Sequence, residues 1–141
     1  MEIVDAKSSK LGKILEDIKN PSKFWTDYGL RSLSKSASIY KKRNTEHDPP
    51  YWRGPIWINI NYLAVRALHS YASKNGPYQS EAQNIYTKLR EALINNMFNQ
   101  YQKTGYIWEQ YDDRTGKPTD AATKPFTGWS ALILLIMGEN Y

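Results

Sequence analysis

The sequence predicts an all-α protein whose helices are joined by long loops that carry aromatic and acidic residues. Residues 55–71 and 80–103 repeat apolar side chains at helical spacing, and residues 129–137 are apolar on nearly every face. Signals for β-strands are few. Because helical hairpins supply a rigid wall and loops supply chemistry, we expect a functional site at one end of the helices.

The first predicted helix covers residues 1–19 and has the weakest signal, because Gly12 and two serines interrupt it. Asn20-Pro21 ends the segment. Its apolar stripe consists of Leu11, Ile14, Leu15 and Ile18. Residues 25–40 then show no clear period, but they contain several large apolar side chains that need burial. We therefore expect a long ordered connection there.

The second predicted helix begins at Pro55, after a loop that two prolines keep extended. Pro49 and Pro50 restrict their own backbone and that of the preceding residue, so residues 46–54 cannot be helical. Proline is favoured at the first position of a helix, and Asn75-Gly76-Pro77 ends this one. Its apolar stripe consists of Ile56, Ile60, Leu63, Ala64, Ala67, Leu68 and Tyr71.

The third predicted helix covers residues 80–103, with Thr104-Gly105 as its C-terminal stop. Its buried side consists of Ile85, Leu89, Ala92, Leu93 and Met97. The last predicted helix follows Thr127, a residue type that caps helix N-termini, and its apolar run needs burial inside something larger. We therefore expect these helices to be a piece of a larger helical domain.

The charge and composition of the chain exclude several classes of partner and site. The net charge is +5, and residues 1–44 carry the whole excess, with ten Lys and Arg against five Asp and Glu. The cluster Lys41-Lys42-Arg43 stands outside any nucleic-acid-binding motif, so we interpret it as a solvated loop face and expect no nucleic-acid partner. The chain has no cysteine for disulfides or thiolate metal sites, and no apolar run approaches the ~20 residues of a membrane span.

Residues 105–113 contain a glutamate, Glu109, between Trp108 and Tyr111. Aromatic side chains stack on sugar rings, and they exclude water around an acid whose basicity matters. The other interpretation is a short buried strand or turn in which Glu109 simply caps or pairs. Taken alone, this stretch favours that structural interpretation, and the rest of the chain decides between the two.

Three long motifs of rare residue types occur in order along the chain. They are Arg43-Asn44-Thr45-Glu46-His47-Asp48-Pro49-Pro50-Tyr51-Trp52-Arg53-Gly54-Pro55-Ile56-Trp57, then Gly105-Tyr106-Ile107-Trp108-Glu109-Gln110-Tyr111, then Pro125-Phe126-Thr127-Gly128-Trp129. The run Tyr28-Gly29-Leu30-Arg31-Ser32-Leu33 belongs with them. Together they resemble the C-terminal region of glycoside hydrolase family sixty-three, the family of the mannosyl-oligosaccharide glucosidases or processing α-glucosidases I.

The resemblance implies that residues 1–141 are a C-terminal fragment of an (α/α)6 toroid, in which paired helices ring a pocket. It implies inverting hydrolysis of a terminal α-linked glucose from an N-glycan precursor in the lumen of the endoplasmic reticulum. Glu109 stands in the motif of the general base. The family's general acid is an aspartate upstream of these motifs, beyond Met1, so we expect this chain alone to be inactive. Asp48 is kept only as a remote candidate for that acid.

The predicted site combines this base with residues that would bind the sugar. Arg53 is expected to hold substrate or orient a carboxylate through its rigid guanidinium, and a buried ion pair with Glu46 or Asp48 is equally favoured. Three tryptophans could either stack on sugar or fill the wall of the toroid, and the second role is favoured for each of them. They are Trp52, Trp57 and Trp129. The remaining predicted substrate-binding residues are Tyr51, Gly54, Asn61, Trp108 and Tyr111.

The expected partners are an oligosaccharide substrate and either the remainder of the catalytic domain or another chain. No cofactor is expected. No metal is expected either, because His47 between two acids in a proline-rich loop is a weak ligand set. The alternative function is a non-catalytic helical module, either a sugar-binding remnant or a scaffold that completes another chain's toroid. Glu109, Arg53 and the aromatic loops favour descent from a working site.

Overall fold

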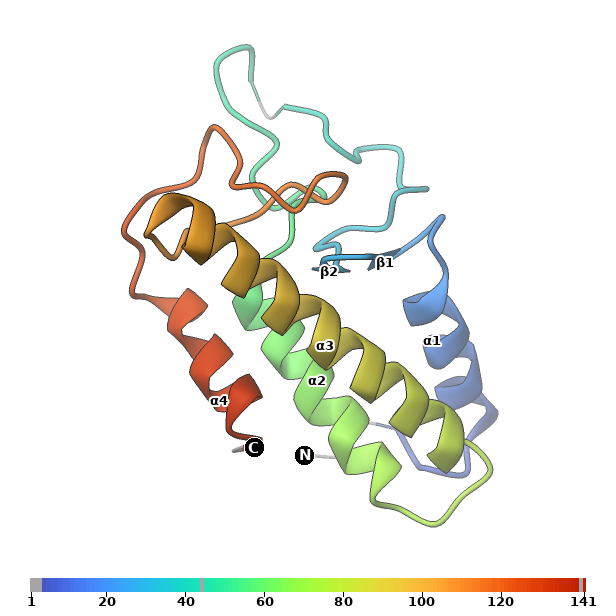
Figure 1. Cartoon of the computed structure of the whole chain (residues 1–141). Helices are drawn as coiled ribbons and strands as arrows, with labels where there is room; N and C mark the ends of the chain where they lie inside the picture. Colours follow the sequence, from blue (N-terminus) through green and yellow to red (C-terminus); the bar gives the residue numbers. More distant parts are fainter. Residues whose placement is uncertain (1–3, 44, 140) are drawn as a thin grey trace.

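The computed structural model describes residues 4–43, 45–139 and 141, and it is mostly helical, as the sequence predicts (Figure 1). A two-stranded antiparallel sheet, with Trp25 paired to Leu30, is the one sheet within these ranges. The elements are α1 (Ser9–Lys19), β1 (Trp25–Thr26), β2 (Gly29–Leu30), α2 (Ile58–Ala72), α3 (Gln79–Thr104), a 3-10 helix η1 (Trp129–Leu132) and α4 (Ile133–Met137).

The two long helices, α2 and α3, match their predictions except at the start of α2. This helix begins at Ile58 rather than at Pro55. Ile56 instead pairs with Tyr111 through two backbone hydrogen bonds of 2.8 and 3.0 Å, so the chain stays extended for three more residues. At the other end, Gly105 closes α3 in the left-handed conformation at φ 73°, which glycine adopts at little cost.

The first and last helices are shorter than predicted. Ser8 caps α1, its Oγ accepting the Lys10 N–H at 3.2 Å, so within the described residues this helix begins at Ser9. Residues 1–3 of the predicted helix lie outside the described residues. The prediction that Thr127 caps the last helix is wrong, because η1 begins at Trp129 with no side-chain cap.

The α2–α3 hairpin forms the centre of the fold, with α1 against α3 on one side and α4 against both helices on the other (Figure 1). Val65 of α2, Leu89 and Leu93 of α3, and Ile136 of α4 are fully buried at this centre. Burial of such side chains is worth about 1.5–3 kcal/mol each, so this contact is the main source of stability.

The loops gather at one end of the hairpin, where α2 begins and α3 ends (Figure 1). Isolated β-bridges join them in series: Arg31 pairs with Ile56, Ile56 with Tyr111, and Tyr111 with Pro118. Three segments distant in sequence are therefore fixed to one another above the rigid helices. This arrangement places the predicted site residues on a single end of the molecule.

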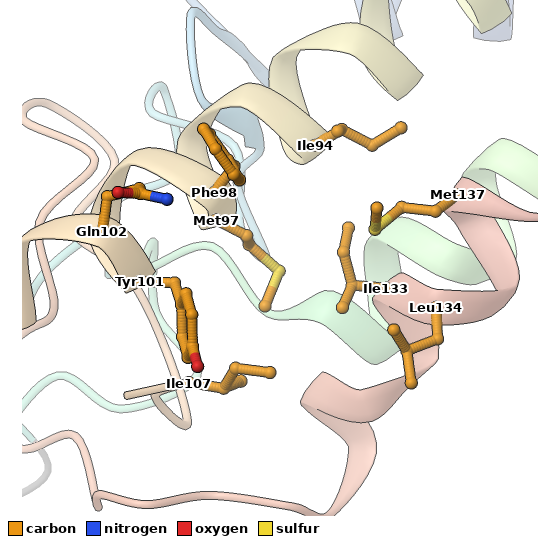
Figure 2. A pocket seen from close by; sticks show the side chains of 9 residues that line it. All are labelled: Ile94, Met97, Phe98, Tyr101, Gln102, Ile107, Ile133, Leu134 and Met137. Carbon is orange, nitrogen blue, oxygen red and sulfur yellow. The ribbon is translucent and has the colours of Figure 1, made fainter. Parts of the chain in front are cut away.

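An apolar groove runs between α3 and α4 (Figure 2). It is lined by Ile94, Met97, Phe98, Tyr101, Gln102, Ile107, Ile133, Leu134 and Met137. Leu134 is 64% exposed and Phe98 is 58% exposed, so the last helix is covered on one face only. Two hydrogen bonds from Arg90 to the carbonyls of Ile136 and Met137 hold α4 beside α3. No helix among the described residues is long and apolar enough to span a bilayer.

We predict that the groove makes the 141-residue chain self-associate, because contiguous exposed apolar surface drives association. The double substitution Phe98→Lys with Leu134→Lys should shift the chain toward monomer in sedimentation velocity over a concentration series. Both side chains are exposed, so the helical content measured by circular dichroism should stay the same.

The control is Ile39→Lys, which places a single lysine at an exposed apolar position in a loop. This control should associate like the unsubstituted chain. A chain that is monomeric before any substitution would contradict the prediction.

Candidate active site

Glu109 is held by its backbone and by both of its side-chain oxygens. Its N–H donates to the Thr123 carbonyl at 3.1 Å. Its Oε1 accepts the Tyr51 hydroxyl at 2.5 Å, and its Oε2 accepts the Thr123 N–H at 3.3 Å. The residue is 5% exposed, and no ion pair between described residues includes it. The carboxylate is thus fixed by two neutral donors.

Tyr51 reaches Glu109 from the loop before α2. Its backbone lies in the left-handed region at φ 42°, which is uncommon for a residue with a side chain. The hydrogen bond to Glu109, together with burial, raises the pKa of Tyr51 to about 12. The phenol is therefore a neutral donor across the physiological range.

Four aromatic rings form a continuous wall next to Tyr51. Trp52 stacks on Trp57 with ring centroids 3.6 Å apart and planes 17° from parallel. Trp129 packs against Trp57 at 5.7 Å, and Phe126 against Trp129 at 5.0 Å. Trp57 is fully buried, whereas Trp52 is 41% exposed. Trp52 is the ring of this wall that solvent reaches most, and Trp57 fills the wall beneath it.

Trp108 and Tyr111 flank Glu109 but differ in exposure. Tyr111 is buried, and its hydroxyl accepts the Trp108 N–H at 3.2 Å. Trp108 is half-buried, and its indole N–H donates to Thr104 at the end of α3. The Lys124 ammonium lies 5.0 Å from the Trp108 ring centroid, within the range of a cation–π interaction. Both rings therefore serve first to fix the backbone around Glu109.

Arg53 and Gly54 shape the loop that carries Tyr51. The Arg53 guanidinium donates to the carbonyls of Lys42 and Arg43 at 3.1 and 3.2 Å. The interpretation of Arg53 as the partner of Glu46 or Asp48 is wrong, since no such ion pair exists among the described residues. Gly54 has φ 129°, and a Cβ there would lie 2.7 Å from the Tyr40 ring. Both residues close this loop onto residues 40–43.

Asn61 lies in the first turn of α2 and is fully buried. Its Oδ1 accepts the Leu30 N–H at 2.7 Å, and its Nδ2 donates to the carbonyls of Leu30 and Trp57. These bonds use the amide to join α2 to β2, so Asn61 supports the site from below. Trp57 and Tyr111, also buried, share this supporting position.

A buried charged cluster around Asp113 anchors the loops behind Glu109. The Asp113 Oδ2 accepts the Arg31 Nε at 2.7 Å and the Tyr40 hydroxyl at 2.5 Å, while Lys41 pairs with Oδ1 at 2.5 Å. Burial opposes ionisation of Asp113, but Lys41, Tyr40 and Arg31 together hold its pKa below the usual range. Burial likewise opposes ionisation of Asp112, yet Lys41 and backbone N–H donors lower its pKa to about 2.

This cluster was not predicted from the sequence. Arg31 stands among apolar residues in its motif, and a buried guanidinium needs a carboxylate partner. That requirement was a signal for a partner, but it did not identify Asp113, which lies 82 residues away.

The loop segments that carry the predicted site residues come together at one end of the helices. Glu109 meets Tyr51, the Ser130 hydroxyl at the start of η1 donates to the Trp108 carbonyl at 2.8 Å, and the starts of α2 and η1 meet where Trp57 packs on Trp129.

Asp48 lies in an exposed loop with its side chain toward solvent. A carboxylate with low exposure beside an aromatic wall can take a proton from a water molecule placed against a sugar ring.

Comparisons with known proteins give one consistent family. Residues 1–139 match the model described as "Glycosyl hydrolase family 63 C-terminal domain". The chain is 54% identical over 139 residues to the protein named Mannosyl-oligosaccharide glucosidase GCS1 from Arabidopsis thaliana, and 52% identical to Alpha-glucosidase 2 from the same plant. It is 42% identical to the Probable mannosyl-oligosaccharide glucosidase of Schizosaccharomyces pombe. Each match covers 99% of this chain but only 16–17% of the relative.

We predict that the Asp113 cluster makes the fold acid-labile. The pKa values of Asp112 and Asp113 are lower in the folded chain than the ordinary 3.8, so their stabilisation is complete above about pH 4. It should be lost as the pH falls from about 4 to about 2, with Asp112 alone accounting for about 2 kcal/mol. Urea unfolding at a series of pH values measures this loss.

Asp113→Asn should lower the free energy of unfolding at neutral pH and weaken its acid dependence, because Arg31 and Lys41 lose their buried partner. Asp120→Asn, at an exposed position, is the control and should change the free energy by less than about 0.5 kcal/mol. An Asp113→Asn chain that keeps the stability of the unsubstituted chain would contradict this role for the cluster.

Proposed function

The chain belongs to glycosyl hydrolase family 63, and we propose that it forms part of an inverting exo-α-glucosidase. The proposed substrate is an N-glycan precursor oligosaccharide, from which the enzyme removes a terminal α-linked glucose. The observation that carries the proposal is Glu109: a carboxylate of low exposure, held by two neutral donors, at the edge of an aromatic wall.

In this proposal Glu109 is the general base. Its carboxylate takes a proton from a water molecule while the water oxygen bonds to the anomeric carbon from the face opposite the leaving group. The glycosidic bond breaks, and its electron pair goes to the leaving oxygen, which a second, protonated carboxyl group supplies with a proton. Inverting enzymes keep the two carboxyl groups roughly 6.5–9.5 Å apart to leave room for the water.

The second carboxyl group is proposed to lie in the remainder of the catalytic domain. Asp112 and Asp113 are poor candidates, because their basic neighbours lower their pKa values and keep them ionised. Asp48 is exposed in this chain and has no basic partner among the described residues that would orient it. The chain spans about a sixth of the length of the curated relatives that it matches, which leaves ample sequence to supply the acid.

The exposure of the remaining site residues separates those proposed to contact the sugar from those proposed to support them. Trp52, half-exposed, is proposed to stack on a sugar ring, with Trp108 and Trp129 as further walls. Arg53 and Gly54 set the shape of the loop that presents Tyr51 and Trp52. Trp57, Asn61 and Tyr111 are proposed to support these residues from the interior rather than to touch the sugar.

The wider setting is also part of the proposal. The antiparallel α2–α3 hairpin is one helix pair of the (α/α)6 toroid, and the apolar groove between α3 and α4 packs against the rest of that domain. Its exposed leucine and aromatic side chains suit a neighbouring helix better than solvent. The complete enzyme is placed in the lumen of the endoplasmic reticulum, where N-glycan precursors are trimmed.

The decisive experiment places this chain in the Arabidopsis relative named Mannosyl-oligosaccharide glucosidase GCS1, in exchange for the stretch that it matches. Glu109→Gln in this chimera should lower kcat by roughly 10²–10⁴-fold, because glutamine keeps the shape but cannot accept the proton. KM should change little, since sugar binding is spread over the aromatic loops.

The matched control is Glu91→Gln, at an exposed position on α3, which should leave kcat unchanged. Near-normal turnover of the Glu109→Gln chimera would make Glu109 a structural acid in an aromatic wall. An inactive unsubstituted chimera that still binds the oligosaccharide would instead support a sugar-binding module.

A further inference from the structure

The contact between Tyr51 and Glu109 links the loop before α2 to the proposed base. The Tyr51 hydroxyl donates to Glu109 Oε1 at 2.5 Å, and the Thr123 N–H donates to Oε2 at 3.3 Å. Each oxygen of an ionised carboxylate has two lone-pair positions. One donor on each oxygen therefore fixes the plane of the group and leaves a position on each for a water molecule.

The direction of the Tyr51 hydroxyl is set by two kinds of contact and by the backbone conformation of the residue. Its carbonyl accepts the Trp57 indole N–H at 3.2 Å. Its ring packs edge-on against Trp57 at 4.8 Å and against Trp52 at 6.0 Å. Its backbone stays in the left-handed region at φ 42°, a conformation that persists where the surroundings over-determine it. The hydroxyl is thus held on Glu109 by the aromatic wall.

We propose that Tyr51 is a positioning residue for Glu109: its hydroxyl orients the carboxylate toward the water. This inference rests on the proposed function of Glu109 as general base. The same aromatic wall that meets the sugar also sets the angle of the phenol, so it couples sugar binding to the orientation of the base.

Tyr51→Phe in the Arabidopsis chimera tests the role in the reaction. We expect kcat to fall by roughly 10- to 100-fold, part of the whole contribution of a general base, while KM changes by less than about threefold. The acidic limb of the kcat/KM profile should move to higher pH, because the Glu109 carboxylate loses the donor that Tyr51 supplies. A ring that only packs would not move this limb.

Tyr40→Phe is the matched control, because it also removes a hydroxyl that donates to a carboxylate, here Asp113. It should lower the melting temperature and leave the acidic limb where it was. If Tyr51→Phe instead raises KM with kcat and the acidic limb unchanged, Tyr51 is a substrate-binding ring and the inference is overturned.

A second measurement separates this inference from the proposed function and needs no activity. In the 141-residue chain, the ring carbon next to the Tyr51 hydroxyl is followed by 13C NMR through an alkaline titration and assigned with Tyr51→Phe. Glu109→Gln should lower the pKa of Tyr51 from about 12 toward the ordinary 10. An unchanged pKa overturns the contact between Tyr51 and Glu109. An inactive chimera with a lowered pKa overturns the glucosidase proposal and leaves only the contact standing.

Discussion

The buried ion pairs of Asp113 are the constraint on which the loop end of the molecule depends. One carboxylate receives Arg31, Tyr40 and Lys41, so it binds residues 31–41 to the segment that carries Glu109. Removing a partner from such a cluster leaves an uncompensated charge in the interior, which costs about 3–5 kcal/mol. The cluster thus fixes which loops lie together around the proposed site.

Backbone pairing then connects the Asp113 cluster to the proposed site. Ile56 pairs with both Arg31 and Tyr111, which places the loop of Tyr51 across from Glu109. The proposed base then receives its donors from two other segments, at Tyr51 and Thr123. The helices lie beneath these loops, and the side chain of Asn61 joins α2 to β2 by hydrogen bonds.

Local sequence determined the helices, but contacts between distant residues determined the site. The apolar spacing in residues 80–103 predicts α3 nearly to its ends, since Gly105 adopts the left-handed conformation that ends a helix. The start of α2 was misplaced because the bridge between Ile56 and Tyr111 outweighs the helical preference of Pro55. The family motif pointed to Glu109, whereas the pairing of Arg31 with Asp113 spans 82 residues and has no local signature.

Glu109 is proposed to activate water for inversion rather than to attack the sugar itself. The most direct test follows the anomeric proton of the released glucose by NMR, as the Arabidopsis chimera hydrolyses an α-glucosylated oligosaccharide. A water-activating base gives inversion, so β-glucose should appear first and mutarotate slowly to the equilibrium mixture. Initial release of α-glucose would show retention and would make the proposed role of Glu109 wrong.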